Sequence, residues 1–271
     1  DTGGPAWARD IRPGQEVRRI DKTAIADAIA QLAGIENEGV RRQARLTALM
    51  RANGLLAGNE GDTVMMEIQS GSGSRTVRVV RGPVRGTMLR FGNLPPLNAI
   101  VDVSERNVPG PTGVRRIGVI AFSVWLPLVA KDLDRAFDRL RNSDGIIIDL
   151  RGNPGGVAGM VSGVAGHVLD SAYMLGTLRQ RTQVLKLTAN PRRVSSGADP
   201  VPVRPYAGPV AILMDPLAGS TSEFFAAGLQ GLGRAHIVGE ISAGAALPAL
   251  MDRLPNGDVM MHVIADLTDS K

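Results

Sequence analysis

The period of apolar and polar positions changes along the chain and separates two regions. From residue 116 onward, short, almost wholly apolar runs such as Gly145–Leu150 alternate with longer segments whose apolar residues recur every three or four positions. Such runs are typical of strands buried on both faces, and the longer segments are typical of amphipathic helices. The expected strands are 116–122, 145–150, 182–187, 209–214, 235–239 and 259–265, and the expected helices are 127–141, 156–169 and 220–230. This order predicts a largely parallel α/β core at 113–271.

The first 82 residues predict a small mixed α+β module. The expected elements are a strand within 11–20, short helices at 23–32 and 40–51, and a hairpin formed by 62–68 and 75–80 around a glycine-rich turn. Residues 83–112 are interrupted by several Pro and Gly residues, so we interpret them as a connection with a single strand at 98–103. In the helix at 127–141, the expected buried face consists of Leu128, Leu133, Phe137 and Leu140.

Composition narrows the classes of function. Of the 271 residues, 44% are hydrophobic but only 3% are aromatic, so the core must consist mainly of aliphatic side chains. The net charge of +5 is spread along the chain, and no dense basic run is interleaved with aromatic residues, which argues against nucleic-acid binding. The chain has no cysteine, which excludes disulfides and thiolate chemistry. No segment predicts a membrane span, a metal site or a cofactor.

Three glycine-rich loops each follow an expected apolar strand. They are 150–156, 215–220 and 239–246. In open α/β sheets, ligands bind beyond the carboxyl ends of the strands, so three parallel neighbouring strands would bring these loops together. Gly155 and Gly156 would then place bare backbone N–H groups near Ser220.

Ser220 is the candidate nucleophile because it stands at the start of an expected helix, where backbone N–H groups and the helix dipole favour negative charge. The same residues, Ser220-Thr-Ser-Glu223, also fit a capping box, in which Glu223 reaches back to the backbone of Ser220. The two interpretations are compatible, and the helix start alone does not choose between them.

Two strings in this region resemble the C-terminal-processing (tail-specific) serine peptidases. They are Asp149-Leu-Arg-Gly-Asn-Pro-Gly-Gly156 and Gly219-Ser-Thr-Ser-Glu-Phe-Phe-Ala-Ala-Gly-Leu-Gln230, the latter followed by a Gly-Arg-Ala-x-Ile-Val-Gly-Glu segment that ends at Glu240. The resemblance implies a crotonase-like α/β core and a polypeptide substrate. It also implies Ser220 as nucleophile and an oxyanion hole formed by the amides of Thr221 and of Gly155 or Gly156.

By the same resemblance, we expect residues 1–82 to form part of a PDZ module, which would bind the C-terminal segment of a polypeptide. By this comparison the module lacks its first elements, and the core stops early, so both ends are expected to be truncated. The family's usual setting is the bacterial periplasm or cell envelope, or outside the cell, and an oligomer is compatible with it.

Two positions depart from the family. Many members pair the serine with a lysine in a Gly-Glu-x-x-x-Gly-Lys-Gly segment, and Ala245 stands at that lysine position here, while Ala249 stands where a glutamine is often found. Without a base, a serine hydroxyl is a poor nucleophile at neutral pH. The remaining candidate supporting residues are Glu223, Glu240 and His262.

Three functions therefore stay open from the sequence. The first is a serine endopeptidase that cleaves unfolded or C-terminally tagged polypeptides. The second is an inactive, peptide-binding member of the same family, suggested by Ala245. The third is a crotonase-type enzyme acting on acyl thioesters, which shares the oxyanion-hole principle but for which no coenzyme-binding segment is present.

Overall fold

The structure is a computed structural model of the whole chain, and it describes residues 3–30, 34–90, 93, 97–111 and 113–269. The chain divides into two compact units, Asp1–Arg85 and Gly86–Lys271. Each unit has its own hydrophobic core. Within the described ranges, no helix combines the length and apolarity needed to cross a bilayer.

The first unit is an antiparallel sheet with helices, as the sequence predicts. Its sheet has the strand order β2-β1-β3-β4. The strands β3 and β4 form a long hairpin, and alternate side chains of this hairpin, including Ile68 and Val77, are buried with Ile20 of β1. The elements are a 3-10 helix at Trp7–Arg9, β1 (Glu16–Ile20), β2 (Thr23–Ala24), α1 (Ile25–Ile29), α2 (Glu38–Leu56), β3 (Thr63–Ser70) and β4 (Gly73–Val80). The last two residues of the helix expected at 23–32 lie outside the described residues.

The second unit is built on a five-stranded sheet of order β13-β12-β9-β8-β7. The strands β8 (Gly113–Phe122), β9 (Gly145–Asp149), β12 (Val210–Met214) and β13 (His236–Gly239) are parallel neighbours, which confirms the predicted parallel core. Ile120, Ile148 and Ile212 are paired across three of these strands, and all three are fully buried.

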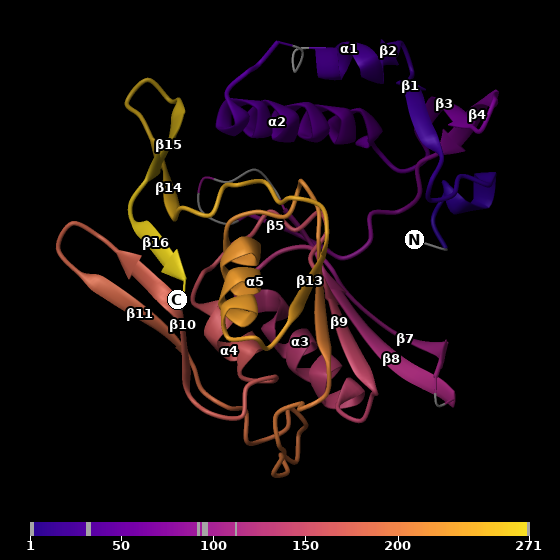
Figure 1. Cartoon of the computed structure of the whole chain (residues 1–271). Coiled ribbons are helices and arrows are strands. Elements are labelled where there is room, and N and C mark those ends of the chain that lie inside the picture. Colours follow the sequence, from indigo (N-terminus) through magenta and orange to yellow (C-terminus); the bar gives the residue numbers. More distant parts are fainter. Residues whose placement is uncertain (1–2, 31–33, 91–92, 94–96, 112, 270–271) are drawn as a thin grey trace. The chain divides into compact units, whose positions relative to one another are not determined.

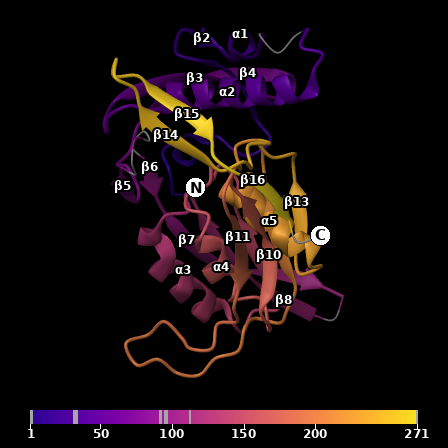
Figure 2. The same ribbon diagram turned by 90° about the vertical axis from the view of Figure 1, so that its left-hand side faces the viewer.

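Three helices cover one face of this sheet. Figures 1 and 2 show α4 (Met160–Ala165) and α5 (Thr221–Gly231) between the five-stranded sheet and a second, three-stranded sheet, and α3 (Pro127–Leu140) beside them, where it contacts β7 and β8. The second sheet has the order β11-β10-β16 and is formed by β10 (Tyr173–Arg179), β11 (Val184–Ala189) and β16 (Asp266–Asp269). The helices α4 and α5 contact it, so the core is layered as sheet, helices, sheet.

The region 83–112 is more structured than the predicted connection with a single strand at 98–103. It contains β5 (Thr87–Leu89), β6 (Leu97–Ala99) and β7 (Val101–Gly110), and β7 pairs with β8 along its whole length as the antiparallel edge of the main sheet. The second unit therefore begins at Gly86 rather than at 113. An edge strand tolerates the proline at position 109, because its outer N–H groups need no partner.

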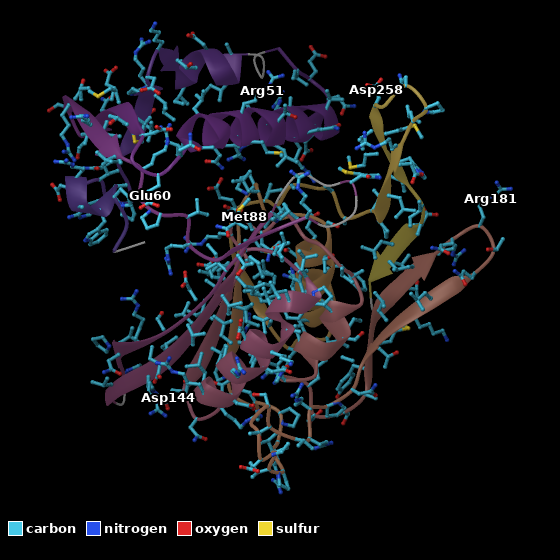
Figure 3. All side chains as sticks on the ribbon, turned by 180° about the vertical axis from the view of Figure 1, so that it is seen from behind. Arg51, Glu60, Met88, Asp144, Arg181 and Asp258 are labelled. Carbon is cyan, nitrogen blue, oxygen red and sulfur yellow. The ribbon has the colours of Figure 1, made fainter. Side chains whose placement is uncertain are left out.

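Smaller corrections concern lengths and faces. The helix expected at 156–169 is reduced to α4, and Leu128 of α3 is exposed, whereas Val129 and Ala136 complete the buried face. The sequence does not predict β10, β16 or β14 (Ala249–Arg253). It does predict β15 (Val259–Val263), as part of the strand expected at 259–265, but not its pairing with β14 in a hairpin. Figure 3 marks Arg181 and Asp258 at the tips of the two hairpins, β10–β11 and β14–β15, which project away from the main sheet.

Candidate active site

The three glycine-rich loops meet at the carboxyl ends of β9, β12 and β13, as predicted. The N–H of Gly219 donates to the carbonyl of Asn153 at 3.0 Å, which joins the first loop to the second. The N–H of Ala243 donates to the carbonyl of Ala218 at 2.9 Å, which joins the second loop to the third. A carboxylate oxygen of Asp215 accepts the N–H of Gly152 at 2.9 Å and tightens the first junction. Parallel pairing of the strands is what brings these loops to one edge of the sheet.

Ser220 lies at the centre of this junction, immediately before α5. Its backbone has φ 52° and ψ −118°, a conformation that is unfavourable for a residue with a side chain. Such strain costs on the order of 1–3 kcal/mol and persists only where the surroundings impose it, which is most common at functional sites. A helix N-terminus adds a positive potential at the serine. The capping box is present as well, with the N–H of Ser220 donating to Glu223 Oε2 at 2.8 Å.

Gly155 packs directly against Ser220, and Gly156 packs against the backbone of Trp125, because neither glycine carries a side chain. A Cβ on Gly155 would lie 2.6 Å from the Cβ of Ser220, and a Cβ on Gly156 would lie 2.3 Å from the carbonyl oxygen of Trp125. Both have positive φ, 104° for Gly155 and 148° for Gly156, which glycine adopts at no steric cost. The loop therefore approaches Ser220 more closely than any other residue type would allow.

The structure separates the two glycine amides that the sequence leaves as alternatives. The N–H of Gly155 donates to Oδ1 of Asn153 at 3.0 Å and is therefore occupied. Within the described part of the chain, the N–H of Gly156 has no such acceptor, and the N–H of Thr221, as the first residue of α5, has no acceptor inside the helix. The Thr221 hydroxyl donates to the carbonyl of Gly156 at 2.9 Å, which holds these two residues side by side.

A buried polar network supports this arrangement, and the sequence did not point to it. The side chain of Asn153 is fully buried and donates to the carbonyl of Phe122 at 2.9 Å. The indole N–H of Trp125 donates to the hydroxyl of Ser222 at 2.9 Å, and this hydroxyl donates to the carbonyl of Asn153 at 3.1 Å. The network ties the end of β8, the first loop and α5 into one rigid block. The Asn-Pro-Gly-Gly string contains Asn153, but nothing in the string shows that its amide is buried.

Asp149 and Arg151 form a fork at the rim of the first loop. The guanidinium of Arg151 donates to both carboxylate oxygens of Asp149, at 2.9 and 2.6 Å. These hydrogen bonds raise the pKa of Arg151 above its usual value, despite the opposing effect of burial. The fork fixes the conformation of the residue at which β9 ends.

Glu223 lies at the site, whereas Glu240 directly follows β13 and His262 lies on a separate hairpin. The carboxylate of Glu223 lies beside the amides of Ser220 and Ala245, at 2.8 and 2.9 Å. Glu240 is exposed after β13, and its amide donates to the carbonyl of Met214. His262 lies on the β14–β15 hairpin, where its Nε2 pairs with Asp252 at 2.8 Å.

Ala245 lies close to Ser220 because both amides share one acceptor, Glu223 Oε2. Its methyl group brings no titratable atom to the site. Ala249 is the first residue of β14 and pairs with Val263. Among the described residues, no group of three or more His, Asp or Glu side chains could hold a metal ion.

A further histidine, His167, has a structural role in the packing of the second unit. It is almost fully buried, stacks on Phe137 with a centroid distance of 4.5 Å, and its Nε2 lies 2.8 Å from Asp134. Arg192 also pairs with Asp134, at 2.9 Å. Burial acts to raise the pKa of Asp134, but the hydrogen bonds and charges of His167 and Arg192 outweigh it and lower this pKa below its usual value.

Comparisons with known proteins agree with this architecture. The model of the family described as "Peptidase family S41" matches residues 116–271, which is more than half of the chain. The chain therefore belongs to peptidase family S41. This match starts within β8 and includes all three loops.

Individual relatives carry related names. The chain is 24% identical over 268 residues to a carboxyl-terminal-processing protease of Picosynechococcus sp., covering 97% of this chain and 53% of that protein. It is 26% identical over 209 residues to the carboxy-terminal processing protease CtpB of Bacillus subtilis, covering 75% of this chain and 37% of that protein. The photosystem II D1 C-terminal processing protease has a similar fold, with a TM-score of 0.53 and 20% identity over all of this chain and 62% of that one. The chain thus spans about half or less of the two curated relatives.

Proposed function

We propose that this chain is the core of a serine-type endopeptidase that cleaves unfolded or C-terminally tagged polypeptides. The observation that carries the proposal is the strained backbone of Ser220, which lies against Gly155 at the N-terminus of α5, next to the hydrogen bond that joins Thr221 to Gly156. Membership of peptidase family S41 supports hydrolysis of peptide bonds as the reaction.

In the proposed reaction, Oγ of Ser220 attacks the carbonyl carbon of the scissile peptide bond. The carbonyl oxygen becomes an oxyanion, and the N–H groups of Gly156 and Thr221 donate to it. Collapse of this intermediate releases the amine product and leaves an ester on Ser220, which water then hydrolyses. Preorganised donors of this kind contribute about 10²–10³ in rate each.

A base must accept the hydroxyl proton of Ser220, return it to the nitrogen of the departing amine, and then take a proton from the water that hydrolyses the ester. The alanine at position 245 cannot do so. We therefore propose that the base is a group other than the side chain of residue 245. Glu223 is a poor choice for this role, because its carboxylate already accepts N–H and O–H groups on both oxygens.

Residues 1–85 are proposed to form a partial PDZ-like module, and the second unit a crotonase-like core. Support for the module comes from its small antiparallel sheet, whose edge strands β2 and β4 offer unpaired backbone groups. PDZ modules bind a peptide C-terminus by adding it as a strand. We propose a polypeptide partner bound in this way. We propose a periplasmic, cell-envelope or secreted location on the basis of the resemblance to the C-terminal-processing peptidases.

The second candidate is a peptide-binding protein without catalysis, and Ala245 and Ala249 favour it. A panel of three proteins separates the two functions: the wild-type chain, Ser220→Ala and Ala245→Lys. Each is incubated with an intrinsically disordered protein, and cleavage is followed by mass spectrometry. The proposed function predicts cleavage by the wild type that Ser220→Ala abolishes. Cleavage by Ala245→Lys alone would instead assign the natural chain to peptide binding.

A further inference from the structure

Glu223 accepts more hydrogen bonds than a helix cap requires. Its Oε1 accepts the hydroxyl of Ser242 and the N–H of Gly244, both at 2.7 Å. Its Oε2 accepts the N–H of Ser220 at 2.8 Å and the N–H of Ala245 at 2.9 Å. In a capping box the side chain needs to accept only the N–H of the capping residue, here Ser220. The three other donors come from a segment about twenty residues further along the chain.

Only a carboxylate suits this position. All four neighbours are donors, and an ionised carboxylate is an acceptor on both oxygens. A glutamine would turn an N–H₂ group toward one pair of these neighbours and leave at least one backbone N–H without an acceptor, even if the Ser242 hydroxyl rotated to accept from it. The charge also strengthens each hydrogen bond relative to a neutral pair.

The four hydrogen bonds connect the nucleophile to residues 242–245. This segment follows β13 and has few other means of holding its shape: it is not part of a helix or strand, and Gly244 has φ 71°. Its backbone contact with the second loop is the N–H of Ala243, which donates to the carbonyl of Ala218. Glu223 therefore supplies most of the described polar contacts that place this segment beside Ser220.

We propose that Glu223 is a positioning residue that fixes residues 242–245 as one wall of the substrate site, at a set distance from Ser220. This inference rests on the proposed function for its catalytic consequence, but its structural part can be tested without activity. Glu223 contacts neither substrate nor a reacting atom in this role. It acts through the Ser220 amide and the segment.

The test compares the wild type with Glu223→Gln, and Glu105→Gln is the matched control. Glu105 lies on β7, at the opposite edge of the sheet from β13, and pairs with Arg116 and Arg139. Glu105→Gln makes the same chemical change as Glu223→Gln, the loss of one carboxylate charge, but away from Ser220. Hydrogen–deuterium exchange is measured for the peptides that cover 216–222 and 240–247. Cleavage of a disordered protein gives kcat and KM.

We expect Glu223→Gln to accelerate exchange in both peptides at least about tenfold, while β9 and the C-terminal half of α5 keep their protection. We expect kcat to fall about 100-fold with KM almost unchanged, since a small misplacement of reacting groups has an effect of that order. Glu105→Gln should change neither quantity. Unchanged exchange and unchanged kcat in Glu223→Gln would overturn the proposal.

Two further outcomes are informative. If the wild type does not cleave but Glu223→Gln still loosens 240–247, the proposed function fails and the positioning role of Glu223 stands. If Glu223→Gln does not fold, Ser242→Ala replaces it, because it removes one donor and no charge. A smaller acceleration of exchange at 240–247 is then expected, and its absence would contradict the proposal.

Discussion

Replacing Gly155 with alanine tests the closest approach in the site. The added Cβ would lie 2.6 Å from the Cβ of Ser220, 2.9 Å from the carbonyl oxygen of Gly219 and 3.0 Å from the amide nitrogen of Thr221. Two of these neighbours are backbone atoms, which cannot move aside as the end of a flexible side chain can. Gly155→Ala should therefore distort the loop that carries the proposed oxyanion hole.

The expected magnitude has two parts. A side chain at φ 104° costs on the order of 1–3 kcal/mol in backbone strain. Overpacking in a rigid environment costs about 1–3 kcal/mol more. We therefore expect Gly155→Ala to lower the free energy of unfolding of the second unit by about 4 kcal/mol. Gly152→Ala is the matched control, because Gly152 lies in the same loop at φ 73° with no atom within 4 Å of its added Cβ. Strain alone predicts a loss of about 1 kcal/mol there.

Urea unfolding followed by tryptophan fluorescence measures both values. The chain has two tryptophans, and Trp7→Phe leaves Trp125, which is fully buried in the second unit, as the sole reporter. A difference of at least about 2 kcal/mol between the two variants is expected from the overpacking term. Equal losses for Gly155→Ala and Gly152→Ala would refute the reasoning, because they would show that Gly155 does not pack against Ser220.

Two other predictions concern strain and pH. Ser220→Gly should be more stable than Ser220→Ala by about 1 kcal/mol in the same urea assay, because glycine adopts the positive φ of 52° without steric strain. Equal stability of the two variants would show that the backbone is not strained. Asp134→Asn should destabilise the protein by about 1 kcal/mol at neutral pH. Because the folded-state pKa of Asp134 is lowered, its contribution is present above the unfolded value of about 4 and is lost as the pH falls through the folded pKa. The deficit of Asp134→Asn should therefore shrink below about pH 4, and a deficit that is constant with pH would contradict this assignment.

The parallel core and the meeting of the three loops could be predicted because they depend on local patterns. The apolar runs that form β8, β9 and β12 are unmistakable in the sequence, and parallel pairing places the loops after them at one edge. The sequence predicts only the start of β7, within the strand expected at 98–103, because the exposed edge position of β7 allows polar residues and a proline, which resemble a linker. Edge strands carry weak sequence signals for this reason.

The details of the site could be predicted only in part. Ser220 and the glycine pair follow from the order of strand, loop and helix. The choice between the amides of Gly155 and Gly156 depends on where the side chain of Asn153 points, which no spacing reveals. Likewise, the capping box alone accounts for the spacing of Glu223 from Ser220. The sequence therefore gives no sign that Glu223 also accepts hydrogen bonds from Ser242, Gly244 and Ala245.

The most direct test of the central claim is the reaction of the chain with an alkyl fluorophosphonate, followed by mass spectrometry of the modified peptide. Such a reagent forms a covalent bond only with a serine that is activated and flanked by an oxyanion hole. The account predicts one adduct, on Ser220, that is absent in Ser220→Ala. A wild-type chain that stays unmodified while a known serine hydrolase reacts under the same conditions, or an adduct on another residue, would contradict it.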